Sequence, residues 1–429
     1  MNIIVLGSGG REAALARKLS ESSKCDKLFC VPGNGGTGSF ACNVAGVDPC
    51  NGEQVVEFAK ANDVELVVVG PEAPLVAGVA DAVRAVGIAC FGPGADGAQM
   101  EGSKEFAKNL MAKYEIPTAA YAVFTELEPA EAYIREQGAP IVIKADGLAA
   151  GKGVTVAQTV EQAVDAVRNC FDGAFGDAGA SVVIEECMTG PECSIMGITD
   201  GEVVLCCEPA QDHKRAYEGD RGPNTGGMGV YSPVPIVTAE EKVAMTKIME
   251  QTVAALKSEG IDYRGCLYGG FMLTPTGPRV VEFNARFGDP ETQALMPRLK
   301  SDLVDVFMAL DAKELSGVEL EWDERFCVGV VLASDGYPGS YEKHKEVGGI
   351  EEAEANGARV YHAGTVLEGG KLYTNGGRVF CVSALGDSFE AARDAAYEAC
   401  EKVSFDNKFL RHDIGARAAR GRDRWDEEM

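Results

Sequence analysis

The chain has 429 residues, of which 46% are hydrophobic and 25% are charged, and this composition of a globular protein excludes a disordered, collagen-like or coiled-coil chain. The formal net charge of -26 leaves no overall attraction for nucleic acid, and an anionic membrane surface would repel the chain. At about 150 residues per domain, the length predicts about three domains.

Strands and helices alternate through the first hundred residues. The apolar and periodic runs predict a strand at 3–6, a helix from Arg11, strands at 28–31 and 64–69, a helix at 75–86 and a strand at 88–91. This order indicates a parallel sheet with right-handed crossovers. Each strand ends in a glycine or proline cluster, and ligand sites in such sheets form at the carboxyl ends of the strands.

Two further units follow this N-terminal one. After a break at Ile116-Pro117, the sequence predicts strands at 120–124, 141–145, 154–157 and 182–185, a long helix at 239–258, and strands at 266–273 and 279–284. After Ser316-Gly317 the pattern changes to short β-rich runs with one late helix. The predicted domains are therefore 1–103, then 104–316 with a lid subdomain at 118–190, and finally 317–429.

Neither the N-terminus nor the cysteines indicate an exported or membrane protein. The sequence begins with a strand-like run and lacks the basic segment that opens a signal peptide. No apolar stretch approaches the roughly 18 residues of a membrane-spanning helix. The 14 cysteines include no C-x-x-C pair, a spacing that is typical of zinc sites. We therefore expect a cytoplasmic protein whose cysteines are reduced and mostly buried.

A first glycine cluster, Gly7 to Glu12, lies between the first strand and the first helix. Glycines at this place let the backbone approach a phosphate at the helix N-terminus. The dinucleotide fingerprint requires a third glycine where Glu12 stands, and an acid after the second strand, where Asn34 stands. These two differences disfavour a dinucleotide oxidoreductase. A smaller phosphate beside Arg11 and a tight turn without a ligand are the remaining interpretations.

A second glycine cluster lies in the run IVIKADGLAAGKGV, residues 141–154. Only three residues separate Gly147 from Gly151, and a strand follows Lys152, so the run is not a Walker A loop. The pattern predicts a β-hairpin whose glycine-rich tip closes over a triphosphate, with backbone N–H groups and Lys152 supplying positive charge. Lys144 on the preceding strand would point at the phosphates or the purine. A flexible surface hairpin is the alternative.

A strand that ends in two acids, Glu185 and Glu186, offers groups for a nucleoside. Backbone groups at such a strand end can bind an adenine edge, and a carboxylate can bind ribose hydroxyls. A solvated strand end is the alternative interpretation, and it is common.

The run VVEFNAR, which ends at Arg286, carries a candidate metal site. Side chains alternate across a strand, so we expect Val281 and Phe283 to face the core and Glu282 and Asn284 to share the other face with Arg286. A carboxylate and an amide oxygen suit Mg²⁺ together with water and substrate phosphates. The arginine could bind an anion through two hydrogen bonds. A half-buried strand with a polar outer face is the alternative.

Positive charge is concentrated in the candidate motifs of this acidic chain. Gln211 to Arg215 contains two adjacent cations, and the glycine-rich loop at 223–229 follows. The other motifs also carry basic residues, so the full set is Lys104, Lys144, Lys152, Lys214, Arg215, Arg221 and Arg286. This concentration favours phosphate binding over a solvated loop.

Taken in order, the motifs resemble those of the phosphoribosylamine-glycine ligase family, also called glycinamide ribonucleotide synthetases, of the ATP-grasp superfamily. The matching motifs span residues 7–415 and read GSGGRE, VPGNGGT, VVGPEAPLVAGV, GSK, IVIKADGLAAGKGV, VIEE, QDHKR, GPNTGGMG, VVEFNARFGDPETQ, HAGT, TNGGRV and HDIG. The resemblance implies an α/β protein with an N-terminal parallel-sheet domain, an ATP-grasp module with a glycine-rich lid, and a β-rich C-terminal domain.

The resemblance also implies a reaction of purine biosynthesis. Such enzymes join glycine to 5-phosphoribosylamine with ATP, and they release glycinamide ribonucleotide, ADP and phosphate. ATP phosphorylates the glycine carboxylate, and the amine then attacks the glycyl phosphate, which a closing lid protects from water. We expect a cytoplasmic monomer that uses Mg²⁺ or Mn²⁺ and binds these small molecules, with no nucleic-acid or membrane partner.

Site residues follow from the same resemblance. ATP is expected to bind Lys104, Lys144, Gly147, Gly151, Lys152, Gly153, Glu185, Glu186, Cys187 and Glu192. The amine and glycine are expected to bind Gly9, Gly10, Arg11, Glu12, Asp212, Lys214, Arg215, Asn224, Thr225, Gly226, Gly227 and Arg286. The metal ion is expected at Glu282 and Asn284. Catalysis by positioning and electrostatics is assigned to Arg286, Asp212 and Lys152.

The sequence departs from the family pattern at two places, and three alternative functions remain open. Ala13 stands where the family usually has histidine, and the strand at 266–273 contains no acid, which leaves the remaining metal ligand unassigned. The alternatives are another ATP-grasp ligase or carboxylase of purine synthesis, a dinucleotide oxidoreductase, and a nucleotide sensor without catalysis. QDHKR, PNTGGMG and GDPETQ argue against the first of these.

Overall fold

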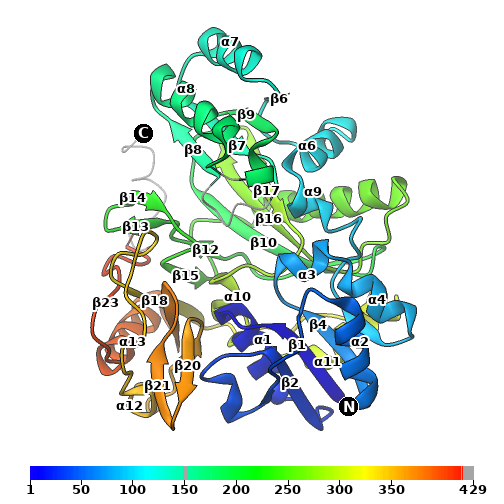
Figure 1. Ribbon diagram of the computed structural model, residues 1–429, viewed down its shortest axis with the longest axis vertical. Coiled ribbons are helices and arrows are strands. Elements are labelled where there is room, and N and C mark those ends of the chain that lie inside the picture. The colour runs from blue at the N-terminus through cyan, green and yellow to red at the C-terminus, as the bar shows by residue number, and fades with distance from the viewer. Residues whose placement is uncertain (148–152, 175, 417, 419–429) are drawn as a thin grey trace.

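A five-stranded parallel sheet forms the N-terminal part of the computed structural model, which describes residues 1–147, 153–174, 176–416 and 418 (Figure 1). The strand order is β3 (Cys42–Asn43), β2 (Lys27–Pro32), β1 (Asn2–Gly7), β4 (Val64–Val69) and β5 (Ala89–Phe91). Every pair is parallel, as the alternation of strands and helices predicts. Buried apolar side chains fill both central strands, since each lies between layers of helices.

The helices of this region are α1 (Gly10–Ser20), α2 (Gly52–Ala61), α3 (Glu72–Val76), α4 (Val79–Ala85), α5 (Gln99–Gly102) and α6 (Lys104–Lys113). The prediction of a single helix at 75–86 is wrong, because α3 and α4 divide this range. Gly78 adopts a φ of 77° between α3 and α4, and this left-handed conformation interrupts the helical backbone.

A small antiparallel sheet, called the lid sheet after the lid subdomain predicted at 118–190, lies at the top of Figure 1. Its order is β6 (Tyr121–Phe124), β9 (Val182–Glu186), β7 (Ile141–Ala145) and β8 (Val154–Ala157), and β7 and β8 form the expected hairpin. Helices α7 (Leu127–Gln137) and α8 (Val160–Asn169) pack their apolar faces against the sheet. Two short turns follow α8, a π-helical one at Cys170–Ala174 and a 3-10 one at Gly176–Gly179.

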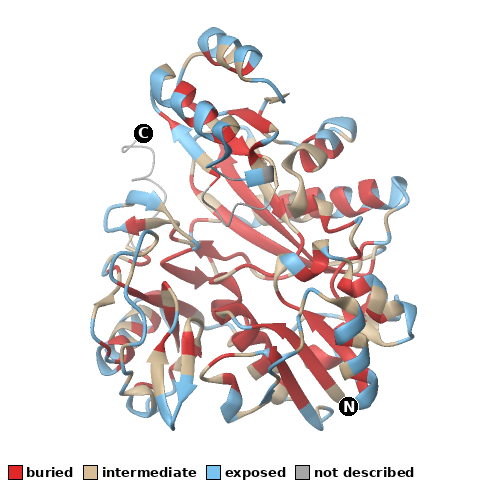
Figure 2. Ribbon diagram, in the orientation of Figure 1, coloured by how far each residue is buried: buried red, intermediate tan, exposed pale blue. Residues whose placement is uncertain are grey.

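A four-stranded antiparallel sheet occupies the middle of the molecule. Its order is β11 (Val204–Cys206), β10 (Glu192–Thr199), β16 (Gly265–Thr274) and β17 (Gly277–Asn284), and the long helix α9 (Ala239–Ser258) packs against it. Figure 2 shows that these strands are almost continuously buried, whereas the lid helices expose their outer faces.

A β-bulge in β17 corrects the expected direction of its side chains. Gly270 of β16 pairs with Glu282, but the next residue, Phe271, pairs with Val280. Val281 is therefore the extra residue of the bulge. Val280 and Phe283 face the core, and Val281 instead lies on the wall of a cavity.

The C-terminal sheet takes strands from both sides of residue 317. Its order is β12 (Gln211–Asp212), β15 (Gly229–Ser232), β18 (Phe326–Ser334), β22 (Arg378–Gly386) and β19 (Arg359–His362), and β23 (Lys408–Phe409) pairs with β18. Between β12 and β15 the chain forms a small hairpin, β13 (Arg215–Tyr217) and β14 (Arg221–Asn224). The stretch that carries QDHKR and PNTGGMG is thus held by the C-terminal sheet.

The remaining elements complete the C-terminal half. They are α10 (Glu291–Leu295), α11 (Leu303–Asp311), α12 (Ile350–Glu354), α13 (Phe389–Lys402), and a two-stranded ribbon of β20 (Thr365–Glu368) and β21 (Lys371–Thr374), with short 3-10 turns at Thr37–Ser39 and Leu315–Gly317 elsewhere in the chain. No helix in the described part of the chain is long and apolar enough to span a membrane.

Candidate functional site

A cavity of about 820 Å³ lies between the lid sheet, the middle sheet and the β13–β14 hairpin. Its wall contains most of the predicted site residues, namely Arg11, Lys104, Lys144, Gly147, Gly153, Glu185, Glu186, Cys187, Glu192, Asp212, Lys214, Arg215, Asn224, Thr225, Gly226, Glu282, Asn284 and Arg286. Among the described residues, four predicted ones lie away from this wall: Gly9, Gly10, Glu12 and Gly227. Gly151 and Lys152 fall outside the described residues.

At the lid end of the cavity, two lysines share one buried carboxylate. Lys144 Nζ lies 2.9 Å from a Glu185 oxygen and donates to the carbonyl oxygen of Val281 at 3.0 Å. Lys108 Nζ lies 3.1 Å from Glu185 Oε2 and donates to Thr118 Oγ1 at 2.8 Å. These contacts connect α6, β7, β9 and β17 at one point.

Lys108 is a cavity residue that sequence reasoning missed. Burial lowers the pKa of its ammonium group to about 8, although Glu185 acts in the opposite direction. Its position was available as a signal, because residues four apart on a helix share a face, and Lys104 begins the same helix. Lys108 lies outside the glycine-rich motifs, so those motifs do not mark it.

Asp146 ties the start of the lid loop to α6. Its Oδ1 accepts hydrogen bonds from the backbone N–H groups of Lys104, at 2.5 Å, and Glu105, at 3.1 Å. Lys104 Nζ in turn donates to the carbonyl oxygen of Gly147 at 2.8 Å. A carboxylate at a helix N-terminus is favoured by the helix dipole, so this contact fixes the lid base and the Lys104 side chain together.

At the end of β9, the two acids have different roles. Glu185 points into the molecule, as described, whereas Glu186 pairs with Arg279 at 3.1 Å and accepts a hydrogen bond from the backbone of Ala120 at 3.2 Å. These bonds lower the pKa of Glu186. Cys187 follows on the cavity wall, and burial raises the pKa of its thiol.

The predicted metal ligands stand side by side on β17 and face the cavity. Burial would raise the pKa of Glu282, but Lys214, Lys144 and Lys104 outweigh it, so the pKa lies below its ordinary value. Within the described residues, neither the Glu282 carboxylate nor the Asn284 amide has a hydrogen bond or salt bridge.

A carboxylate and an amide oxygen that have no other partner among the described residues fit a divalent cation, which prefers oxygen ligands. In the described part of the chain, no cluster of three His, Cys, Asp or Glu side chains is placed to hold a metal ion. A cation at Glu282 and Asn284 would therefore depend on phosphate and water oxygens for its remaining ligands, as Mg²⁺ commonly does.

Arg286 lies on the cavity wall between two carboxylates. Its Nη2 is 2.7 Å from Glu101, and its Nε is 3.5 Å from Glu72. The Glu72 carboxylate is also 3.9 Å from Arg11 Nη2. Burial raises the pKa of Glu101, whereas at Glu72 the two arginines outweigh burial and lower the pKa. The arginines are thus held in place by acids of α3 and α5.

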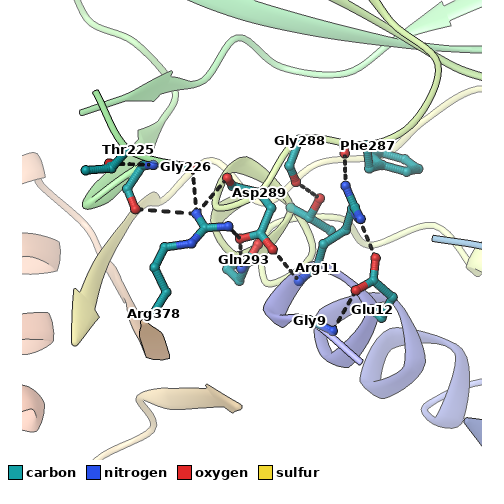
Figure 3. A network of polar contacts seen from close by, with 12 residues as sticks. Gly9, Arg11, Glu12, Thr225, Gly226, Phe287, Gly288, Asp289, Gln293 and Arg378 are labelled. Atoms are coloured by element: carbon teal, nitrogen blue, oxygen red, sulfur yellow. Dashed lines mark hydrogen bonds and ion pairs between the residues drawn. The ribbon is translucent and has the colours of Figure 1, made fainter. Parts of the chain in front are cut away.

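The carboxylates of Glu12 and Asp289 cap the N-terminus of α1 (Figure 3). Glu12 Oε2 accepts a hydrogen bond from the Gly9 backbone at 2.7 Å, and Glu12 Oε1 lies 2.5 Å from Arg11 Nε. Asp289 Oδ2 accepts one from the Arg11 backbone at 3.3 Å. The first glycine cluster therefore supports Arg11, which reaches the cavity, while Gly9, Gly10 and Glu12 stay behind it.

The opposite wall carries Asp212 and Lys214, whose charged groups lie 3.2 Å apart. Burial opposes the charge on Lys214, but Asp212, Tyr268 and Glu192 raise its pKa well above the ordinary value. Sequence reasoning did not single out Glu291 on this wall. Its Oε1 accepts from Tyr268 at 3.0 Å and from Ser194 at 3.2 Å, and burial raises its pKa.

Comparison with known proteins places this arrangement in a family. Three domain models of phosphoribosylglycinamide synthetase match the chain: the N domain over 1–101, the ATP-grasp (A) domain over 102–292 and the C domain over 327–417. The chain belongs to the phosphoribosylglycinamide synthetase family. The phosphoribosylamine–glycine ligase of Pseudomonas aeruginosa is 52% identical over 422 residues, 97% of this chain and 98% of that protein. The ligase of Rhizobium meliloti is 51% identical over 419 residues, 97% of this chain and 99% of that protein.

Solved structures agree with membership of the phosphoribosylglycinamide synthetase family. The crystal structure of phosphoribosylamine–glycine ligase from Thermotoga maritima matches with a TM-score of 0.85 and 34% identity, covering 96% of this chain and all of that one (100%). The biotin carboxylase domain of Hydrogenobacter thermophilus 2-oxoglutarate carboxylase, solved with MgADP, ADP and bicarbonate, has a TM-score of 0.73, and the match covers 95% of this chain and 91% of that one. At 18% identity the second match concerns the fold alone. The expected α/β architecture with an ATP-grasp module is confirmed.

Proposed function

We propose that this protein joins glycine to 5-phosphoribosylamine at the expense of ATP, giving glycinamide ribonucleotide, ADP and phosphate, in purine biosynthesis. The single observation that carries the proposal is the cavity, which lies between the lid sheet and the β13–β14 hairpin and has Glu282 and Asn284 on its wall. The family membership supports the same reaction, because curated relatives at about 50% identity are named phosphoribosylamine–glycine ligases.

ATP occupies the lid end of the cavity in this proposal. The end of β9, from Glu185 to Cys187, and the lysines Lys104 and Lys144 form this end. Glu192 would bind the ribose, and the loop that starts at Gly147 and ends at Gly153 would close over the phosphates. The roles of Gly151 and Lys152 in binding ATP rest on the sequence pattern and the family resemblance, because both residues lie outside the described part of the chain.

The metal ion, Mg²⁺ or Mn²⁺, would be held by Glu282 and Asn284. When bound, it supplies positive charge that neutralises the phosphate oxygens as the terminal phosphoryl group is transferred. The charges of Lys144 and Lys214 stabilise the ionised form of Glu282. The chain itself therefore adds positive charge beside the proposed metal site.

Glycine and the amine occupy the opposite end. The glycine carboxylate displaces ADP from the terminal phosphorus, which forms the acyl phosphate. The nitrogen of phosphoribosylamine then attacks the acyl carbon, inorganic phosphate leaves, and the nitrogen loses a proton. Arg286 and Lys214 would position the anionic groups, and Asp212, which lies 3.2 Å from Lys214, would accept that proton.

Further residues would bind the phosphoribosyl group or support the residues that bind it. Arg11, Lys214, Arg215 and the loop Asn224–Gly226 would bind the phosphoribosyl group, while Gly9, Gly10, Glu12 and Gly227 would act behind that surface by holding Arg11 and the loop. The acidic chain would act on these small molecules as a cytoplasmic monomer, without a nucleic-acid or membrane partner.

The test is glycine-dependent release of ADP, with phosphoribosylamine formed in place from ribose 5-phosphate and ammonia. Turnover should require Mg²⁺ and every substrate, and it should disappear in Glu282→Ala. Glu57→Ala is the matched control, because Glu57 is exposed on α2, away from the cavity. ATP turnover that does not need glycine, or that needs bicarbonate instead, would overturn the named substrates but leave ATP use intact.

A further inference from the structure

Arg378, the first residue of β22, reaches from the C-terminal sheet into the wall of the cavity (Figure 3). Its Nη1 donates to the carbonyl oxygens of Gly226 at 2.5 Å and Asp289 at 2.9 Å, and a third carbonyl, that of Gly227, is 3.4 Å away. Its Nη2 lies 3.2 Å from Asp289 Oδ1. Three backbone carbonyls and one carboxylate thus share a single guanidinium group.

The loop that receives Arg378, Gly226–Gly227, is closely packed on both sides. Gly227 has a φ of 112°, and a Cβ atom there would lie 2.4 Å from Pro290 Cδ. The Gly226 N–H donates to Tyr337 Oη at 3.0 Å. Arg378 covers the other side, since its Cζ would lie 3.0 Å from a Cβ at Gly226. The loop is therefore clamped between two residues of the C-terminal region and the proline.

Asp289 extends the same contact to the N-terminal sheet domain. Its Oδ2 accepts the backbone N–H of Arg11 at 3.3 Å, and its Oδ1 accepts from Gln293 Nε2 at 2.8 Å. Burial opposes its charge, but Arg378 and Arg11 lower its pKa below the ordinary value, so it remains a carboxylate. One ion pair consequently joins four segments that are far apart in the sequence: the start of α1, the loop after β14, the turn before α10 and the start of β22.

We infer that Arg378 is a positioning residue for the amine substrate: it sets the Gly226–Gly227 loop and, through Asp289, the start of α1, so that both line the phosphoribosylamine end of the cavity. This inference rests on the proposed function, which places that substrate there. The planar guanidinium can reach the carbonyls and the carboxylate at once, whereas the ammonium of a lysine is a single point of charge. Its bonds go to protein atoms, so it acts through the loop and not as a ligand.

The test compares Arg378→Ala and Arg378→Lys with Arg359→Ala in steady-state assays that vary one substrate at a time. Arg359 is a matched control, because it lies on the neighbouring strand β19 and also bridges to α1, through Glu21 at 3.0 Å, yet it is not on the cavity wall. Arg378→Ala should raise the KM for phosphoribosylamine roughly 10- to 100-fold, because truncating one partner of a buried charge pair is costly and releases both the loop and the start of α1. The KM for ATP should stay within twofold, Arg378→Lys should recover part of the loss, and Arg359→Ala should behave as wild type.

Asp289→Asn is the second variant, and it carries the test if Arg378→Ala does not fold. It keeps the side-chain volume and the backbone carbonyl but removes the charge, and it should raise the same KM. An unchanged KM for phosphoribosylamine in folded Arg378 and Asp289 variants would overturn the inference. An equal rise in the KM values of ATP and phosphoribosylamine, together with a lower melting temperature, would also overturn it, because that is general destabilisation. Absence of ligation in the wild type would instead reject the proposed function.

Discussion

Lys108 and Glu185 form an ion pair of 3.1 Å in which each side chain is only 3% exposed. Such a pair is unusual because taking two charges out of water is costly unless further hydrogen bonds satisfy them. Here Lys144 supplies a second cation and Thr118 accepts from Lys108. The pair therefore joins α6 to the lid sheet at the end of the cavity that is proposed to bind ATP.

We predict that Lys108→Met weakens ATP binding about tenfold and lowers the free energy of unfolding by about 3 kcal/mol, because Glu185 keeps only one cation. Calorimetric titration with ATP and urea unfolding would measure the two effects. Lys113→Met is the control on the same helix, since Lys113 is 63% exposed. Equal behaviour of the two variants would show that the buried pair has no special role.

Asp146→Asn should separate helix capping from nucleotide binding. Loss of the charge at the N-terminus of α6 should cost about 1 kcal/mol of stability, and the KM for ATP should rise several-fold because Lys104 is no longer held at Gly147. Ser388→Ala removes a comparable cap from α13, where the Ser388 side chain accepts the Ala391 N–H. That control should lose stability alone. An unchanged KM in Asp146→Asn would contradict the coupling.

Gly70→Ala should destabilise the first turn of α1 by crowding Glu12. A Cβ at Gly70 would lie 2.4 Å from Glu12 Cγ, and overpacking of this kind costs about 1–3 kcal/mol. The KM for phosphoribosylamine should rise as well, because Glu12 holds Arg11. Gly317→Ala is the control, since nothing lies within 4 Å of its added Cβ. Denaturant unfolding would measure the loss of stability, and steady-state kinetics would measure the rise in KM. A stable, fully active Gly70→Ala variant would refute the prediction.

Acid should destabilise the protein through His213. Burial and the nearby Arg411 lower its pKa from 6.5 to about 4, and its Nε2 accepts the Gly415 N–H at 3.0 Å, which an imidazolium cannot do. The unfolded chain therefore binds this proton at higher pH than the folded one. The contribution of neutral His213 to the free energy of unfolding is fully present above pH 6.5. It is lost as the pH falls toward about 4, and the loss is up to roughly 3 kcal/mol.

Urea unfolding between pH 7 and pH 4 would measure this loss. His213→Gln should show a smaller loss than wild type over that range, because the variant has no group there to protonate. His344→Gln is the control, since His344 is 60% exposed, and it should follow the wild type. Parallel pH curves for all three proteins would rule out His213 as the cause.

Local patterns in the sequence were enough to place several parts of the site. The hairpin strands at 141–145 and 154–157 and the helix at 239–258 have the predicted bounds, because apolar period and turn residues act over a few residues. The same holds for Glu282 and Asn284, which reach the cavity from one strand. Side chains two apart on a strand share a face whatever the rest of the chain does.

Contacts between distant segments were decided by the tertiary structure alone. The bulge at Val281 reverses the expected face of that residue, since it depends on how β17 pairs with β16. The caps at α1 come partly from Asp289, and the loop after β14 is held by Arg378. The sequence by itself determined the family, the main elements and the kinds of polar side chain that each motif carries. Only folding determined which carboxylates and cations meet, because such pairing depends on long-range packing that no local pattern records.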